Sequence, residues 1–133
     1  MRNRPALTFD DAKTMMAACE AEARKNGWAV TIAIVDDAGY LLNLVRLDGA
    51  GPLSSQVALA KARTAALTRR PSQFWEERVK ERPSFLKFPE ILPITGGVPV
   101  VVGQDCVGAV GVSGVQSHQD EQIALAGANA VQS

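Results

Sequence analysis

Two pairs of short β-strand segments, each joined by a tight turn, constrain the fold of this chain more than any other feature. Residues 28–36 and 40–47 are rich in β-branched and apolar residues and flank a turn that contains Gly39. Residues 98–102 and 106–113 flank a second turn of the same kind. Strand segments joined so closely pair antiparallel, so the sequence predicts two β-hairpins.

Helical patterns precede, separate and follow the hairpins. Thr8 and Asp11 form a capping sequence, and the apolar residues after them recur at helical spacing until Asn26 and Gly27. Three more helices are predicted: an alanine-rich one capped by Ser54, a short one at residues 73–80, and a last one from Ser117 to about Val131. Hairpins separated by helices are typical of an α+β fold with a mostly antiparallel sheet.

The segment between the third helix and the second hairpin is the least regular part of the chain. Residues 82–93 contain three prolines, and a loop of this length inside a compact domain is often functional. Residues 92–95 are predicted to add a short strand before Gly96 and Gly97.

Length and composition limit the classes of protein. The 133 residues are predicted to form one domain, residues 1–133. Equal numbers of acidic and basic residues, 14 of each, argue against a nucleic-acid partner. The chain shows no apolar run long enough for a membrane span and no secretory signal, so we expect a cytoplasmic protein. Two cysteines make no disulfide framework, and a single histidine excludes a multi-histidine metal site.

Charge is distributed unevenly. Residues 61–87 carry eight Lys and Arg against three Glu, whereas residues 88–133 contain no Lys or Arg and four acidic residues. A solvated helix face accounts for the basic run. The alternatives are a basic wall beside a pocket and a contact between subunits of opposite surface charge.

The glycine-rich stretch at residues 108–114 leads directly into the last helix. Its spacing is not that of a dinucleotide fingerprint, and no second strand follows it. Ser113 and Gly114 are predicted to bring an anion to the free N–H groups of the helix start. His118 in the first turn would be disfavoured as a cation, which suits a metal ligand or a general base. Close packing and simple helix capping explain the same residues without any ligand.

Several ordered motifs together resemble the GlcG/HbpS haem-binding family. They cover residues 8–130 and are Val35-Asp36-Asp37-Ala38-Gly39, Arg46-Leu47-Asp48-Gly49-Ala50, Lys61-Ala62-Arg63-Thr64-Ala65, Gly96-Gly97-Val98-Pro99, Val107 to Gly114, Gln119-Asp120-Glu121 and Ala126-Gly127. The resemblance implies a profilin-like domain with a five-stranded antiparallel sheet flanked by helices. It also implies a homo-oligomer, and links to haem binding or to the catabolism of small organic acids.

Three hypotheses for function follow. The first is a protein that binds haem or a similar anionic ligand, with His118 as the axial donor before Tyr40, the cysteines and the methionines. The second is a cofactor-free enzyme of the tautomerase, hydrolase or dehalogenase type, acting on unsaturated hydroxy-dicarboxylic acids from aromatic-ring degradation. The third is a non-catalytic accessory subunit of an organic-acid catabolic operon.

The first two hypotheses use one set of site residues. The cations expected to hold an anionic group are Arg46, Lys61 and Arg63. The enzyme hypothesis assigns proton transfer to His118, Asp120 and Glu121. Both hypotheses place the ligand where the Gly96-Gly97 turn, the Ser113-Gly114 step and the start of the last helix meet.

Overall fold

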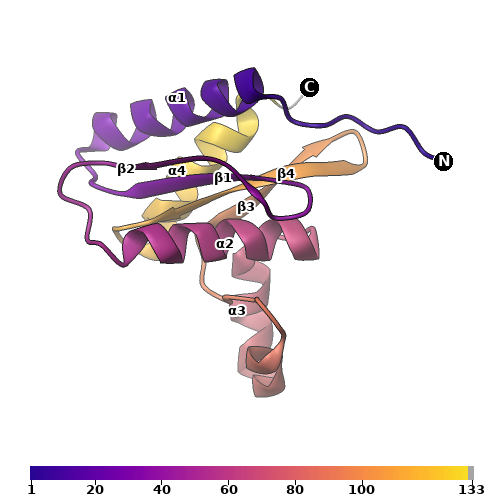
Figure 1. Cartoon of the computed structure of the whole chain (residues 1–133). Coiled ribbons are helices and arrows are strands. Elements are labelled where there is room, and N and C mark those ends of the chain that lie inside the picture. Colours follow the sequence, from indigo (N-terminus) through magenta and orange to yellow (C-terminus); the bar gives the residue numbers. More distant parts are fainter. Residues whose placement is uncertain (132–133) are drawn as a thin grey trace.

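The two predicted hairpins form one antiparallel sheet in the computed structural model, which describes residues 1–131. Its four strands, in the spatial order β2-β1-β4-β3, are β1 (Thr31–Asp36), β2 (Leu41–Arg46), β3 (Gly97–Val102) and β4 (Asp105–Ser113). Helices cover both faces of the sheet (Figure 1). The predicted α+β fold is confirmed, with four strands in place of the expected five.

The fifth strand, predicted at residues 92–95, does not form. Pro93 has no N–H group, and the remaining donors of the segment are used elsewhere. The Leu92 N–H donates to the Thr64 hydroxyl at 2.8 Å, and the Ile94 N–H donates to the Leu92 carbonyl at 2.9 Å. The segment is therefore tied to α2 and to itself, and has no donor left for a strand ladder.

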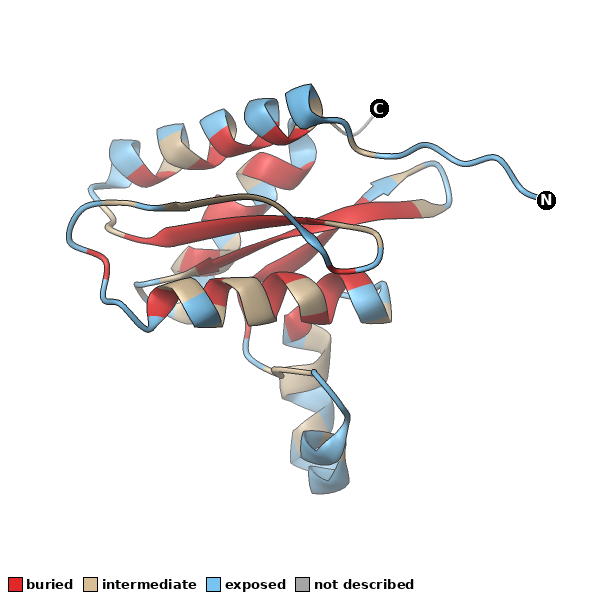
Figure 2. Ribbon diagram, viewed as in Figure 1, coloured by how far each residue is buried: buried red, intermediate tan, exposed pale blue. Residues whose placement is uncertain are grey.

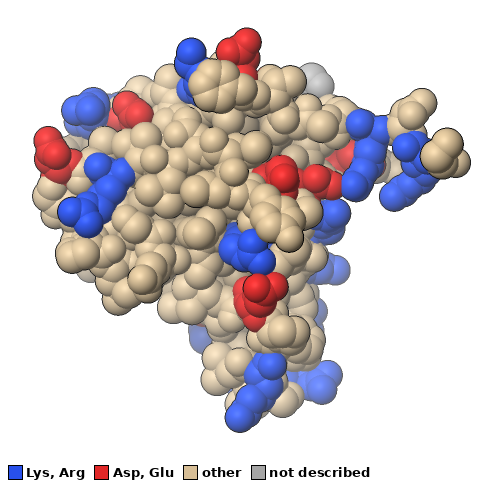
Figure 3. All heavy atoms as spheres, in the orientation of Figure 1, with Lys and Arg blue, Asp and Glu red and all other residues tan. Residues whose placement is uncertain are grey.

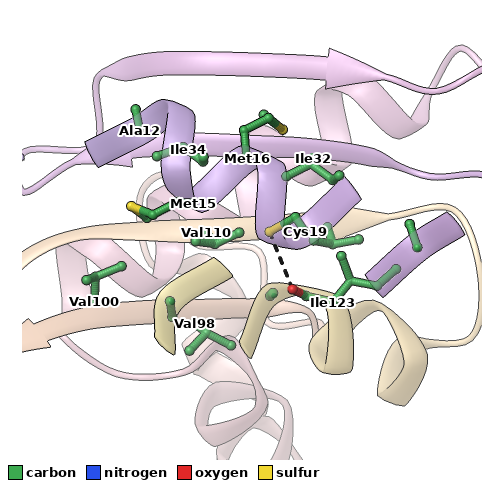
Figure 4. Packing of buried hydrophobic residues seen from close by; sticks show 14 of the residues in the cluster. Ala12, Met15, Met16, Cys19, Ile32, Ile34, Val98, Val100, Val110 and Ile123 are labelled. Atoms are coloured by element: carbon green, nitrogen blue, oxygen red, sulfur yellow. Dashed lines mark hydrogen bonds between the residues drawn. The ribbon is translucent and has the colours of Figure 1, made fainter. Parts of the chain in front are cut away.

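Two helices pack on one face of the sheet, α1 (Phe9–Asn26) and α4 (Ser117–Asn129). Thr8 caps α1 through a capping box with Asp11, and Gly27 ends it at a φ of 70°, as the sequence predicts. The buried side chains of α1 and α4 meet those of β1, β3 and β4 in the main hydrophobic core (Figure 4).

Cys19 lies inside this core and is not available as a ligand. Its Sγ donates to the Ile123 carbonyl at 3.4 Å across the α1–α4 contact (Figure 4). Burial raises the pKa of the Cys19 thiol to about 12, so the thiol stays protonated at neutral pH. Met15 is fully buried in the same cluster.

The opposite face of the sheet is covered by α2 (Ser54–Thr68), whose buried alanines form a second, thinner core layer. At two strand positions the helix approaches the sheet so closely that no side chain fits on the strand. A Cβ on Gly111 would lie 2.1 Å from the Ala58 carbonyl oxygen, and a Cβ on Gly97 would lie 2.1 Å from that of Lys61. Glycine at these strand positions is therefore required by packing.

Two helix caps differ from the predictions. Ser54 and Ser117 are the first residues of their helices, and the N-caps are Leu53 and Gln116. The Ser54 hydroxyl lies 2.8 Å from that of Thr31 on the sheet, which takes it away from a capping position.

A helical arm projects from the body of the molecule (Figure 1). It comprises α3 (Ser72–Glu81) and the 3₁₀-helix η1 (Pro83–Lys87), and we define the arm as residues 70–88. The helix α3 packs mainly against η1 and only marginally against α2 and β3. Figure 2 shows that the arm is mostly exposed, in contrast with the buried strands.

Among the described residues, no helix combines the length and the apolar character that a membrane crossing requires.

Candidate functional site

A buried ion pair joins α2 to the first turn of α4. Lys61 Nζ lies 3.0 Å from Asp120 Oδ2, and the side chains of both residues are 2% exposed. The ammonium also donates to the Val112 carbonyl at 3.0 Å. Asp120 Oδ1 accepts the Val115 N–H at 3.1 Å, so both carboxylate oxygens are occupied. The pair fixes the start of α4 against the end of β4.

Burial raises the pKa of the Asp120 carboxyl, and the charge and hydrogen bond of Lys61 oppose that shift. The hydrogen bond from Val115 and the charge of His118 also favour the ionised form. The position of Asp120 suits it to hold Lys61 rather than to transfer protons to a ligand, because its side chain is enclosed.

The glycine turn at Gly96 and Gly97 closes over this ion pair. Gly96 has a φ of 137°, and a Cβ there would lie 2.8 Å from Lys61 Nζ and equally close to the Val112 carbonyl oxygen. The Gly96 carbonyl accepts the Val112 N–H at 3.0 Å. Both glycines are buried, and the atoms directly facing them belong to the protein itself.

Two further carboxylates lie beside the turn. Glu76 of α3 accepts the Thr95 N–H at 2.7 Å and the Thr95 hydroxyl at 2.9 Å through one oxygen. Burial raises the pKa of the neighbouring Glu121 carboxyl, and the negative charge of Glu76 raises it further. Glu121 is only half-buried, so it is the member of this group that can exchange a proton with a ligand.

His118 lies exposed in the first turn of α4, one residue after the helix begins. The turn is held by Gln116, whose N–H donates to Gln119 Oε1 at 3.2 Å. His118 precedes Asp120 of the buried pair by two residues in the same turn of α4. His118, Asp120 and Glu121 are therefore gathered at one helix start, together with Lys61.

The other predicted site residues are more dispersed. Ser113 ends β4 and is half-buried, and a Cβ on Gly114 would lie 2.6 Å from the Ala29 carbonyl oxygen. Arg46 is the last residue of β2. It lies on the same line across the sheet as Ser113, because Thr31 of β1 pairs with both residues. Arg46 is exposed and forms no ion pair within residues 1–131.

Arg63 does not reach this group. Its guanidinium donates to the Gly39 carbonyl at 2.8 Å and lies 3.2 Å from a Glu90 carboxylate oxygen. It therefore ties α2 to the first hairpin turn.

Sequence reasoning also missed Glu76 and Thr95, because a single Glu inside a basic helical run carries no signal that it folds back onto the glycine turn.

Two hollows in the surface of the described chain have no lining residue from the start of α4. One, of about 390 Å³, is lined by Arg24, Gly27, Trp28, Ala29, Leu47 and Asp48. A groove of about 210 Å³ on the arm is lined by Arg70, Phe74, Trp75, Arg78 and Phe85. Within the described residues, no three His, Cys, Asp or Glu side chains gather as a metal site of their own would require.

The motifs of the sequence, the fold and the helix start agree with one family of proteins. The model of the family described as "Haem degrading protein HbpS-like" matches residues 7–129. The chain belongs to the HbpS-like family. Protein GlcG of Escherichia coli K12 is 44% identical over 114 residues, which are 85% of this chain and 85% of GlcG.

Solved structures that are similar to this chain have the same fold. HbpS of Streptomyces reticuli, solved as a double mutant, has a TM-score of 0.93 and 34% sequence identity, covering 100% of this chain and 92% of that one. The PduOC:haem complex has a TM-score of 0.87, covering 96% of each chain. At 24% identity, the PduOC likeness shows the common fold alone.

Proposed function

We propose that this protein binds haem, with His118 as the axial ligand. The observation that carries the proposal is the position of the one histidine of the chain, exposed at the start of α4. An imidazole ligates haem iron through a ring nitrogen that must be accessible, and His118 is an exposed residue. The family description names haem, and the PduOC domain of the same fold is solved as a haem complex.

The other donor types are less suitable. Cys19 and Met15 are fully buried in the core, and Cys106 is buried with its Sγ 3.4 Å from the Gly108 carbonyl. Tyr40 is 69% exposed at the first hairpin turn and is the alternative donor. Bound haem supplies a redox-active iron, and the chain's own part is to hold that iron and the two propionates.

Cations must hold the propionates. Of the three cations predicted from the sequence, two are already paired within the chain and one is not. Lys61 is occupied by Asp120, and Arg63 is occupied by Gly39 and Glu90. Arg46 is exposed and unpaired within the described residues, so we assign it to one propionate. A charge-assisted contact of this kind contributes about 1.5–3 kcal/mol to binding.

The experiment is a titration of the purified protein with haemin, followed at the Soret band. His118→Ala is expected to shift the band and to weaken binding at least tenfold, which corresponds to about 1.4 kcal/mol. Tyr40→Phe is the matched control, because it removes an exposed alternative donor and should leave the spectrum unchanged.

Two results would count against the proposal. If His118→Ala leaves band position and affinity unchanged while Tyr40→Phe alters them, His118 is not the ligand. If the wild-type protein shows no saturable binding, haem is not the ligand of this protein.

We infer a second candidate function from Glu121. This half-buried carboxyl has a raised pKa and lies beside His118 at the helix start, which is an arrangement suited to proton transfer. The chain would then act on unsaturated hydroxy-dicarboxylic acids, with tautomerisation as the simplest reaction. Ultraviolet absorbance of a conjugated hydroxy-dienoate would report turnover, and Glu121→Gln should abolish it.

A further inference from the structure

The hollow of about 390 Å³ lies where the end of α1 and the start of the loop after β2 come together. Figure 1 shows both segments at the same end of the molecule. Its volume falls within the range of roughly 300–1,000 Å³ that is typical of small-molecule sites. None of its lining residues belongs to the helix start of α4, so the hollow can hold a ligand of its own.

Two apolar side chains form a fixed wall of this hollow. Trp28 and Leu47 line it and also pack against the main hydrophobic core, and both are half-buried. The Trp28 N–H donates to the Ala23 carbonyl at 2.9 Å, and the Leu47 N–H donates to the Val30 carbonyl at 2.9 Å. The backbone that carries this wall is therefore held in place before any ligand binds.

Two side chains of opposite charge complete the lining. Arg24 comes from α1 and Asp48 from the loop after β2, and both are exposed. Within residues 1–131 neither forms an ion pair, either with the other or with another residue. Gly27, which ends α1, also lines the hollow, so the negative end of the helix dipole joins Asp48 in favouring a bound cation.

The charge of this end of the molecule is mixed. On the face drawn in Figure 3, basic and acidic atoms are interspersed at this end, whereas basic atoms predominate at the tip of the arm. A ligand that carries both a positive and a negative group suits such an environment better than a ligand of one sign.

We propose that this hollow binds a free α-amino acid with an aromatic side chain. The guanidinium of Arg24 would hold the carboxylate, for which its planar fork is well suited. The carboxylate of Asp48 would hold the ammonium group. The aromatic side chain would lie against Trp28 and Leu47, where ring contacts of the edge-on or offset kind are favourable.

Other classes of small ligand fit the two charges less well. A dicarboxylate, or haem with its two propionates, would bring a negative group toward Asp48. An amine without a carboxylate would leave Arg24 without a partner. The zwitterion is the class that uses both charges, and the site is therefore distinct from the one proposed for haem.

The test is a titration with L-phenylalanine in the absence of haemin, using the fluorescence of the Trp75→Phe variant. The chain has two tryptophans, so this variant leaves Trp28 as the only one, at the wall of the hollow. We expect a saturable change of Trp28 fluorescence with a sub-millimolar Kd. Isothermal calorimetry of the wild-type protein should give the same Kd.

Charge-removing variants test the two polar contacts. Arg24→Gln and Asp48→Asn should each weaken L-phenylalanine binding at least tenfold, because each removes a charge-assisted hydrogen bond. Lys25→Gln is the matched control, because Lys25 follows Arg24 on α1, is also exposed and does not line the hollow. It should bind as the wild type does. Far-ultraviolet circular dichroism checks that each variant is folded.

Two analogues separate the contributions of the ligand's groups. 3-Phenylpropionate lacks the ammonium group and should bind the wild type at least tenfold more weakly than L-phenylalanine, and Asp48→Asn should not weaken it further. Phenethylamine lacks the carboxylate and should bind equally weakly to the wild type and to Arg24→Gln.

Three results would overturn the proposal. The first is the absence of saturable L-phenylalanine binding in both measurements. The second is equal affinity for L-phenylalanine and 3-phenylpropionate, because Asp48 would then have no role. The third is a loss in Lys25→Gln as large as that in Arg24→Gln, because the effect would then be one of overall charge.

The haem titration is an independent measurement. Saturating L-phenylalanine should leave the affinity for haemin unchanged, and competition between them would overturn the assignment of two separate sites. A protein that binds L-phenylalanine and no haem removes the proposed function and leaves this inference, and the converse result does the opposite.

Discussion

Removing the charge of Asp120 should destabilise this protein more than any surface change, because Lys61 would be left buried and unpaired. The two side chains are each 2% exposed, and the ammonium lies 3.0 Å from the carboxylate. Breaking such a pair on one side destabilises a protein by about 3–5 kcal/mol. Asp120→Asn is the suitable change, because the amide oxygen can still accept the Val115 N–H.

Urea unfolding measures the effect. A loss of about 3 kcal/mol lowers the midpoint by roughly 1–3 M for a domain of this size. Lys61→Met combined with Asp120→Asn is the control, since it removes both charges and should recover a large part of the lost stability. A cost below about 1 kcal/mol for Asp120→Asn would refute the reasoning, because it would mean that Lys61 does not depend on this partner.

Two further predictions concern stability. Gly97→Ala should destabilise the fold or prevent folding, because the new Cβ would lie 2.1 Å from a backbone oxygen of α2. Gly51→Ala is the control: no atom lies within 4 Å of the new Cβ, so its thermal unfolding should be nearly unchanged. Glu121→Gln should make the protein more stable than wild type at pH 7, because the folded state raises the pKa of Glu121 above its ordinary 4.5 and its ionisation therefore opposes folding. This advantage should appear as the pH rises through 4.5 and vanish below it; a constant difference between pH 3 and pH 7 in urea unfolding would show that Glu121 is not the cause.

The sequence correctly predicted the structural features that depend only on residues near each other in the chain. The capping box at Thr8, the left-handed Gly27 and both hairpins depend on neighbours in sequence, and all are present. The fifth strand failed because its N–H groups bond to distant side chains, among them Thr64, which no pattern at residues 92–95 could indicate.

The site was partly predictable for a similar reason. His118, Asp120 and Glu121 are close in sequence, so their grouping at one helix start follows from the helix itself. The burial of Lys61 does not follow, because the sequence assigned Lys61 to an anionic ligand, whereas its partner in the structure is Asp120, 59 residues later in the chain. The glycines were correctly placed in turns and strands, yet what approaches them closely is α2 and its Lys61.

The arm shows where pattern reading has no information. Residues 82–93 read as an irregular segment, and in the structure they contain η1, which folds back on α3 through aromatic contacts. Those contacts leave the arm projecting from the body, which only the three-dimensional arrangement shows (Figure 1).

Resonance Raman spectroscopy of the haem complex prepared with ¹⁵N-labelled histidine tests the central claim most directly. The chain has a single histidine, so the label marks His118 alone. If His118 ligates the iron, the iron–nitrogen stretching band of the reduced complex shifts to lower frequency on labelling. A saturated complex whose iron–ligand bands are unaffected by the label would contradict the assignment of His118 as the haem ligand.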